Sequence, residues 1–142
     1  MCGIIGISSN KSVSANIINS LKKLEYRGYD SAGVATLFGG EINEVKSEGR
    51  VDNLEQNFDL KSLKGNIGIG HVRWATHGFP NSINAHPHSS DNVSVVHNGI
   101  IENSTILKKH LVNKGHTFKS QTDTEVIVHL ITENLKTMEL EE

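Results

Sequence analysis

The first seven residues, Met1 to Ile7, read MCGIIGI and give the chain an apolar start that carries no charge. The stretch from Cys2 to Ile7 is rich in isoleucine and predicts a buried strand. A chain that enters a buried strand almost at its first residue has an N-terminus tied to the fold. Cys2 is the only cysteine of the 142 residues, and it lies at the start of this strand.

Beyond this strand the sequence predicts alternating helices and strands. Apolar residues recur at helical spacing from Val13 to Leu24, after Ser12 as a candidate N-cap. Strands at 32–37 and 41–45 flank a pair of glycines and are expected to form a hairpin. The other expected elements are a short helix at 51–58, strands at 65–73 and 93–96, a helix over 106–112 and a last helix over 123–135.

Local signals refine these elements. Asn103 is a candidate N-cap, Gly115 a candidate left-handed C-cap, and Thr122 with Glu125 a candidate capping box. Strict alternation along the strand at 65–73 would place Ile67, Ile69, His71 and Arg73 on one face. Residues 74–92 are expected to form a long irregular segment, which in a compact domain is often functional, and residues 139–142 a frayed end. The mixed order predicts an α/β or α+β layered domain.

Composition and charge narrow the class of function. The formal net charge is −2 and the 14 basic residues are scattered, so we expect neither nucleic acid nor a membrane surface as a partner. A lone cysteine forms no internal disulfide, and the start lacks the basic and apolar regions of a signal peptide. These observations predict a cytoplasmic protein that acts on small molecules.

The position of Cys2 is the sharpest chemical signal. Removal of Met1 would place a thiol and a free α-amine on one residue, and because an α-amine is partly neutral near pH 7 it can accept the thiol proton. The same arrangement activates N-terminal threonine nucleophiles. Taken alone, Cys2 favours the simpler interpretation of a small packing residue at the start of a strand, because lone cysteines usually have that role.

Six motifs in a fixed order extend this signal. After MCGIIGI they are YRGYDSAG at 26–33, GHVRWATHG at 70–78, NAHPH at 84–88, HNGIIEN at 97–103 and TDTEV at 122–126. Together they resemble the class II, N-terminal-nucleophile glutamine amidotransferases from residue 1 to about residue 135. Within that class they most resemble the glutamine–fructose-6-phosphate aminotransferases, since amidophosphoribosyltransferases typically carry HRGQD-like and RYST-like segments at 26–30 and 73–76.

The resemblance implies a role for each matching residue. Cys2 would be the nucleophile, and the Asn98 amide and the Gly99 N–H the oxyanion hole. Arg73 would hold the α-carboxylate of glutamine, Asp123 its α-ammonium group, and Arg27 would lie near the N-terminal amine, favouring its neutral form. A mobile loop would bring in further substrate-binding residues, namely Trp74, Thr76 and His77.

Simpler interpretations of the same residues stay open. An arginine at a strand end is usually a surface charge, and an acidic residue such as Asp123 is favourable in the first turn of a helix without any ligand. Asn98-Gly99 would also serve as a plain turn, and Trp74 as a core residue. Five histidines suggest a metal site as a hypothesis. His86 and His88 lack zinc-ligand spacing and accompanying cysteines, so we expect neither a metal nor a cofactor.

The resemblance also implies a fold and partners. It implies a four-layer α/β/β/α sandwich of the N-terminal-nucleophile hydrolases, here truncated, with residues 1–142 as the N-terminal part of the glutaminase domain. Glutamine would be the substrate, fructose 6-phosphate the acceptor at sugar isomerase domains that this chain lacks, and the full-length enzyme a homo-oligomer. The alternatives are another amidotransferase, a glutamine-binding module without turnover, or an inactive fragment, and we expect residues 1–142 alone to be inactive.

Overall fold

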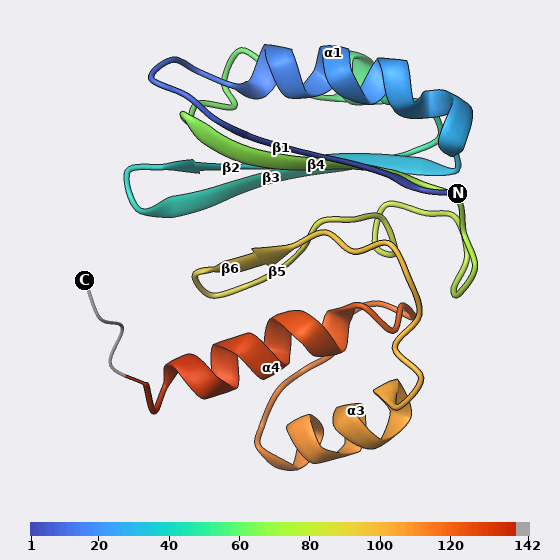
Figure 1. Ribbon diagram of the computed structural model, residues 1–142, viewed down its shortest axis with the longest axis vertical. Helices are drawn as coiled ribbons and strands as arrows, with labels where there is room; N and C mark the ends of the chain where they lie inside the picture. Colours follow the sequence, from blue (N-terminus) through green and yellow to red (C-terminus); the bar gives the residue numbers. More distant parts are fainter. Residues whose placement is uncertain (139–142) are drawn as a thin grey trace.

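The computed structural model describes residues 1–138, and these fall into four layers (Figure 1). Helices α1 (Ser14–Leu24) and α2 (Val51–Asn57) cover one face of a four-stranded sheet. A two-stranded sheet lies against the other face of this sheet. Helix α4 (Glu125–Leu135) packs against this second sheet, and α3 (Ser104–Asn113) packs against α4 on the side away from it. This α/β/β/α order confirms the predicted fold class.

The first sheet has the strand order β1-β4-β2-β3, and every neighbouring pair is antiparallel. Its strands are β1 (Gly3–Ser8), β2 (Ser31–Phe38), β3 (Glu41–Glu48) and β4 (Ile67–Arg73). At one end of the sheet the start of β1 and the start of β2 flank the end of β4, with Gly3 paired to Val72 and Ser31 to Arg73. Cys2 therefore lies beside the last residues of β4, although about 70 residues separate them in the sequence.

Glycines on β4 allow α1 to pack closely on the sheet. A Cβ atom at Gly70 would lie 2.6 Å from Ile17 and 3.0 Å from Leu21, both of which are fully buried. Because Gly68, Gly70 and Val72 face the helix, the alternate residues of β4 face the second layer. The predicted face with His71 and Arg73 is therefore confirmed.

The predicted hairpin is confirmed between β2 and β3. Gly39 and Gly40 have φ angles of 61° and 83°, and Phe38 pairs with Glu41 across the turn. Two consecutive residues with positive φ match the twist of the flanking strands, and this conformation favours glycine.

The second sheet corrects one expectation. β6 (Val93–Val95) lies where a strand was predicted, but its partner β5 (His88–Ser90) falls within the segment expected to be irregular. β5 consists of three polar or titratable residues, so it lacks the apolar pattern of a strand. It forms because it pairs with β6 and because Ser89 Oγ donates to Glu44 over 2.5 Å.

Two predicted helix starts are wrong in their capping. The N-cap of α1 is Val13 rather than Ser12, and no side chain caps it. Thr122 and Glu125 do not form a capping box: α4 begins at Glu125, and the carboxylate of Glu125 accepts from the backbone N–H groups of Lys119 and Ser120. Glu125 thus ties the preceding loop to the helix start, while the N–H groups of Val126 and Ile127 donate to the carbonyls of Asp123 and Thr124.

The other local predictions fare better. Asn103 occupies the N-cap position of α3, although its side chain makes no capping hydrogen bond. Gly115 has a φ of 93°, and the N–H of His116 reaches the carbonyl of Leu111 over 3.0 Å, as in a left-handed helix end. The predicted frayed end at 139–142 lies outside the described residues. Within residues 1–138 every helix is too short or too polar to cross a bilayer.

Candidate active site

A cavity of about 530 Å³ opens where β1 begins and β4 ends. Its walls come from the two residues before β1, from Arg27, from the end of β4 and the loop after it, and from the segments that precede α3 and α4. The structure thus brings together every residue predicted for the site: Cys2, Arg27, Arg73, Trp74, Thr76, His77, Asn98, Gly99 and Asp123.

The thiol of Cys2 touches the backbone of Trp74. The N–H of Trp74 donates to Sγ over 3.2 Å, and Sγ lies 3.5 Å from the carbonyl oxygen of the same residue. The carbonyl oxygen of Cys2 accepts from Arg27 Nε at 3.0 Å and from Asn98 Nδ2 at 3.2 Å. Cys2 is therefore held on both its side chain and its backbone, while Met1 is 80% exposed at the cavity mouth.

Arg73 is a buried cation, with only 4% of its surface exposed. Burial lowers the pKa of Arg73, and the nearby Cys2, Asp30 and Asp123 oppose this shift. A guanidinium stays protonated in proteins even so. Within the described chain its hydrogen-bond partners are carbonyl oxygens, from His77, Gly78 and, at 3.3 Å, Phe79. Because no carboxylate pairs directly with Arg73 there, the cavity offers a positive charge to an anionic ligand.

The loop after β4 folds over this guanidinium. Its start is anchored where the Ala75 N–H donates to Asp30 Oδ2 over 2.8 Å. Within the loop, Thr76 Oγ1 and His77 Nδ1 lie 3.3 Å apart and form a hydrogen bond. Trp74 meets Tyr29 edge to face but is 49% exposed, so it is not the core residue that the simpler interpretation requires. The loop therefore offers exposed side chains around a fixed first turn.

Asn98 and Gly99 face Cys2 from the opposite wall. Asn98 Oδ1 lies 2.9 Å from His71 Nε2, and the Asn98 amide nitrogen points to Cys2. Gly99 has a φ of 153°, and a Cβ atom there would lie 2.9 Å from His97 Nε2. Both the backbone conformation and the neighbouring ring thus favour glycine at this position, which lines the cavity.

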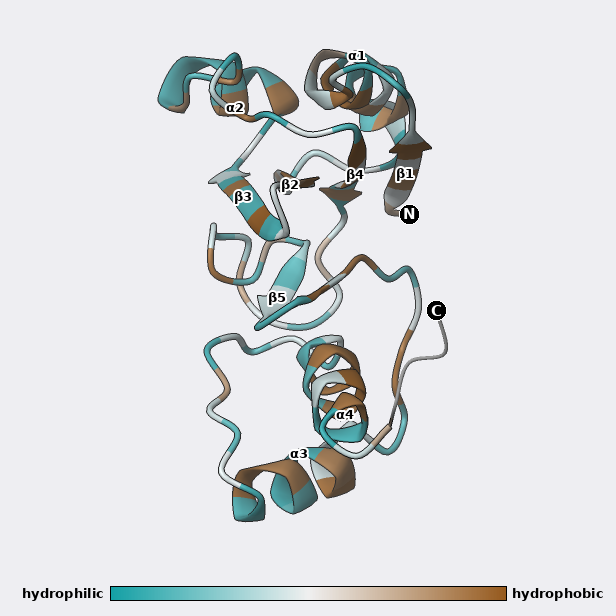
Figure 2. Cartoon of the chain, turned by 90° about the vertical axis from the view of Figure 1, so that its left-hand side faces the viewer, coloured by the Kyte–Doolittle hydropathy of each residue, from teal (hydrophilic) through white to brown (hydrophobic). Residues whose placement is uncertain are grey.

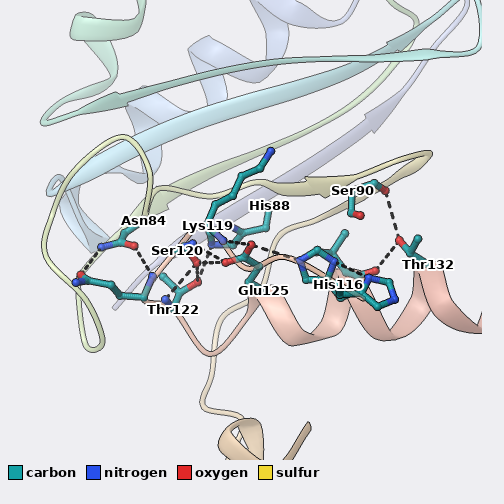
Figure 3. Close-up of polar contacts among 12 residues, drawn as sticks. Asn84, His88, Ser90, His116, Lys119, Ser120, Thr122, Glu125 and Thr132 are labelled. Carbon is teal, nitrogen blue, oxygen red and sulfur yellow. Dashed lines mark hydrogen bonds and ion pairs between the residues drawn. The ribbon is translucent and has the colours of Figure 1, made fainter. Parts of the chain in front are cut away.

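The loop that carries Asp123 is fixed by a buried polar network (Figure 3). The carboxylate of Glu125 accepts from the Ser120 N–H at 2.7 Å, and Thr122 Oγ1 lies 2.8 Å from His88 Nε2. Burial opposes ionisation of Glu125, but the hydrogen bonds from Ser120 and Lys119 outweigh it and lower the pKa of Glu125. Asp123 itself accepts from the Ile101 N–H at 2.6 Å. One Asp123 oxygen is thereby tied to the chain before α3, which orients the carboxylate at the cavity wall.

Three histidines lie buried beneath the cavity. Burial lowers the pKa of His71 and of His88 to about 4 and lowers the pKa of His86 further. The rings of His71 and His86 stack with centroids 4.3 Å apart. These histidines are neutral at pH 7, so they act through hydrogen bonds and packing. Among residues 1–138 no three His, Cys, Asp or Glu side chains gather in an arrangement that could hold a metal ion.

His71 lines the cavity but was not among the predicted site residues. The sequence feature that could have identified it is its position two residues before Arg73, on the same face of β4. The sequence alone identified a polar histidine there and could not show that its ring meets Asn98.

The layer order, with a cysteine at the entry to the first strand and a polar cavity beside it, defines the N-terminal-nucleophile class of glutamine amidotransferases. A sequence profile described as a glutamine amidotransferase domain matches residues 58–139. The chain belongs to this family.

Relatives with assigned names resemble the chain over almost all of its length. A glutamine–fructose-6-phosphate aminotransferase [isomerizing] of Mesorhizobium japonicum is 56% identical over 135 residues, or 95% of this chain. One from Clostridium acetobutylicum is 59% identical over 92% of the chain. The chain spans only 22% of the length of each of these relatives. The structure of glutamine phosphoribosylpyrophosphate amidotransferase from B. subtilis matches 100% of this chain and 30% of its own, with a TM-score of 0.79 at 31% identity.

Proposed function

We propose that this chain is the N-terminal part of the glutaminase domain of a glutamine–fructose-6-phosphate aminotransferase, and that Cys2 is its nucleophile. The observation that carries the proposal is the meeting of Cys2, Asn98 and Arg73 in one cavity. These residues supply a thiol, an amide donor and a buried cation for an anionic group. Their separation in the sequence, from residue 2 to residue 98, makes an accidental grouping a poor explanation.

Glutamine fits the charges of the cavity. Arg73 offers a planar pair of N–H donors to the α-carboxylate, and Asp123 offers an acceptor to the α-ammonium group. The carbonyl oxygens of the 77–79 segment that now occupy Arg73 would give way to the carboxylate when the loop with Trp74, Thr76 and His77 rearranges around substrate. The side-chain carboxamide of glutamine would then extend toward Cys2.

The proposed reaction has two steps. After loss of Met1, the α-amine of Cys2 accepts the thiol proton, and Sγ attacks the carboxamide carbon. The oxyanion is stabilised by the Asn98 amide and the Gly99 N–H. Arg27 keeps Cys2 in place by donating from Nε to the carbonyl oxygen of Cys2. The intermediate collapses to a γ-glutamyl thioester, and the proton carried by the amine leaves with ammonia. Water then hydrolyses the thioester to glutamate and restores the thiol.

The use of the ammonia is inferred from the named relatives. Relatives at 56% and 59% identity are glutamine–fructose-6-phosphate aminotransferases, so fructose 6-phosphate is the acceptor we propose, at domains beyond these residues. We also propose that the full-length enzyme is a homo-oligomer, to be tested by light scattering.

The proposal is tested with the full-length enzyme, given glutamine and fructose 6-phosphate. We expect glutamate and glucosamine 6-phosphate in equal amounts. Absence of glutamate release from processed, folded enzyme would refute the glutaminase assignment. Glutamate release that does not depend on fructose 6-phosphate and yields no amino sugar would refute the acceptor.

A second candidate is the glutaminase part of an amidophosphoribosyltransferase. It is favoured by the structural match to such an enzyme over the whole of this chain, at a TM-score of 0.79. The lower identity of 31% makes it the weaker candidate. Formation of phosphoribosylamine from phosphoribosyl pyrophosphate in the same assay would decide for it.

A further inference from the structure

The contact between His71 and Asn98 fixes which end of the Asn98 amide faces the nucleophile. The Asn98 oxygen can only accept a hydrogen bond, so at 2.9 Å His71 Nε2 must carry the proton and donate it. The other end of the amide is the NH₂ group, which donates to the backbone carbonyl oxygen of Cys2 at 3.2 Å. The two contacts are consistent with each other in this orientation alone.

The tautomer of His71 is fixed by its surroundings. The ring is fully buried, and its Nδ1 has no hydrogen-bond partner among the described residues. Burial, partly opposed by the hydrogen bond to Asn98 and by a contact with the backbone of His97, lowers the pKa of His71 to about 4, so the ring carries one proton at neutral pH. That proton is used at Nε2, where it meets an acceptor, rather than at Nδ1, where it would meet none.

The ring is also held in place. His71 lies on the central strand β4, opposite Ile4 of β1 and Gly33 of β2. It stacks on His86 at 4.3 Å with an angle of 22° between the ring planes. A rigid donor at this point resembles the supporting hydrogen bonds that orient functional groups in other sites.

We propose that His71 is a positioning residue, which holds the Asn98 amide with its NH₂ group toward the reacting carbonyl. Without the donor at Nε2, the amide is free to turn its oxygen toward Cys2, where it would repel an oxyanion. This inference rests on the proposed function, because it concerns the oxyanion of glutamine hydrolysis.

Two substitutions of His71 distinguish the role of Nε2 from that of Nδ1. In His71→Gln the amide nitrogen can occupy the place of Nε2 and still donate to Asn98. In His71→Asn the shorter side chain reaches only the place of Nδ1. We expect His71→Gln to keep kcat for glutamine hydrolysis within about 5-fold, and His71→Asn to lose about 10²-fold, near the loss from removing one oxyanion donor. KM should change little, because the oxyanion exists only in the transition state.

Alkylation of Cys2 by iodoacetamide is the control for the pocket. This substitution at a saturated carbon displaces iodide and forms no oxyanion, so both variants should alkylate at the rate of the natural enzyme. The number of reactive thiols also gives the number of folded active sites. Dividing the rate by that number gives a kcat per folded site, so the comparison stays valid if either variant is recovered in low yield. In the Asn98→Ala background the difference between the two His71 variants should vanish, because no amide remains to be oriented.

The outcomes separate the inference from the function beneath it. Equal kcat values for His71→Gln and His71→Asn would overturn the inference, as would a difference that persists in Asn98→Ala. A parallel loss of alkylation and hydrolysis in His71→Asn would also overturn it, because that pattern signals general damage. Failure of the natural enzyme itself to release glutamate would refute the proposed function instead.

Discussion

The backbone N–H of Trp74 donates to the sulfur of Cys2 over 3.2 Å and so joins the N-terminal residue of the site to the first residue after β4. This contact fixes the position of the sulfur against the backbone at the end of β4. Trp74 also begins the loop that covers Arg73. The backbone that starts the proposed substrate-binding loop thus also contacts the proposed nucleophile.

Replacement of Cys2 by alanine should abolish glutamine hydrolysis in the full-length enzyme, because no sulfur remains to form the thioester. Amination at the acceptor site with free ammonia should persist, since that site lies outside these residues. Both rates are measured by glutamate and amino-sugar release. Glutamine hydrolysis by Cys2→Ala at a near-natural rate would exclude the proposed nucleophile.

Substitution of Arg73 by lysine should raise KM for glutamine by about 10-fold to 100-fold, equivalent to about 1.5 to 3 kcal/mol for a hydrogen bond to a charged group. An ammonium cannot reproduce the planar pair of donors. Arg50→Lys is the matched control, because Arg50 is exposed and its guanidinium lies 3.9 Å from the carboxylate of Glu25 in a weak ion pair. Equal KM values in the two variants would remove Arg73 from the substrate site.

Gly99→Ala should lower kcat by about 10² to 10³-fold, the range for loss of one oxyanion donor. The added Cβ would meet the His97 ring at 2.9 Å, and a φ of 153° is strained for a residue with a side chain, so we expect the backbone to turn away from this conformation and to displace the N–H. Gly115→Ala is the control: its φ is 93° but its Cβ would meet nothing within 4 Å. We expect Gly115→Ala to reduce stability by about 1 to 2 kcal/mol and leave kcat intact. A Gly99→Ala enzyme with natural kcat would exclude the N–H from the oxyanion hole.

Met1 should be absent from the enzyme made in cells, as an intact-mass measurement would reveal. If Met1 stays, the nitrogen of Cys2 is an amide that cannot accept the thiol proton, and Met1 occupies the cavity mouth. A form with Met1 blocked by an N-terminal extension should lose most glutaminase activity and keep its circular dichroism. Full turnover by the extended form would show that a side chain, such as His77, serves as the base.

Acid should destabilise the fold through its buried histidines. His71 and His88 have a pKa of about 4 in the fold against 6.5 when unperturbed. The unfolded chain therefore binds protons first, so stability is complete above pH 6.5 and falls as pH drops toward 4, by about 1.4 kcal/mol per pH unit for each histidine. Urea unfolding at pH 7 and pH 5 measures this loss. In His88→Gln the loss should shrink by about 2 kcal/mol, and an unchanged loss would contradict the buried neutral state of His88.

The sequence predicted most of the fold because its periodic segments are long. The alternation on β4 and the two glycines of the hairpin are local signals, and each leads to one structure. β5 escaped prediction because His88, Ser89 and Ser90 form a strand only through their partners in space.

For the site, the motifs identified which residues meet in the cavity but not how they contact one another. Glu125 matched a capping box, yet its carboxylate binds the loop at 119–120, because that loop returns to the helix start. The sequence placed His71 on the same strand face as Arg73 but assigned it no role. Its contact with Asn98 depends on how two layers pack, which no spacing in the sequence specifies.

The Gly39-Gly40 turn lies at the other end of the sheet from the cavity, since β2 runs from Ser31 beside Arg73 to Phe38 at the turn. Seven residue steps of a strand separate them by about 23 Å. Both glycines open to solvent, with nothing within 4 Å of an added Cβ. The turn is therefore a natural attachment point for a fluorophore or a surface linker, which would let single molecules be immobilised and followed while the terminal amine of Cys2 stays free.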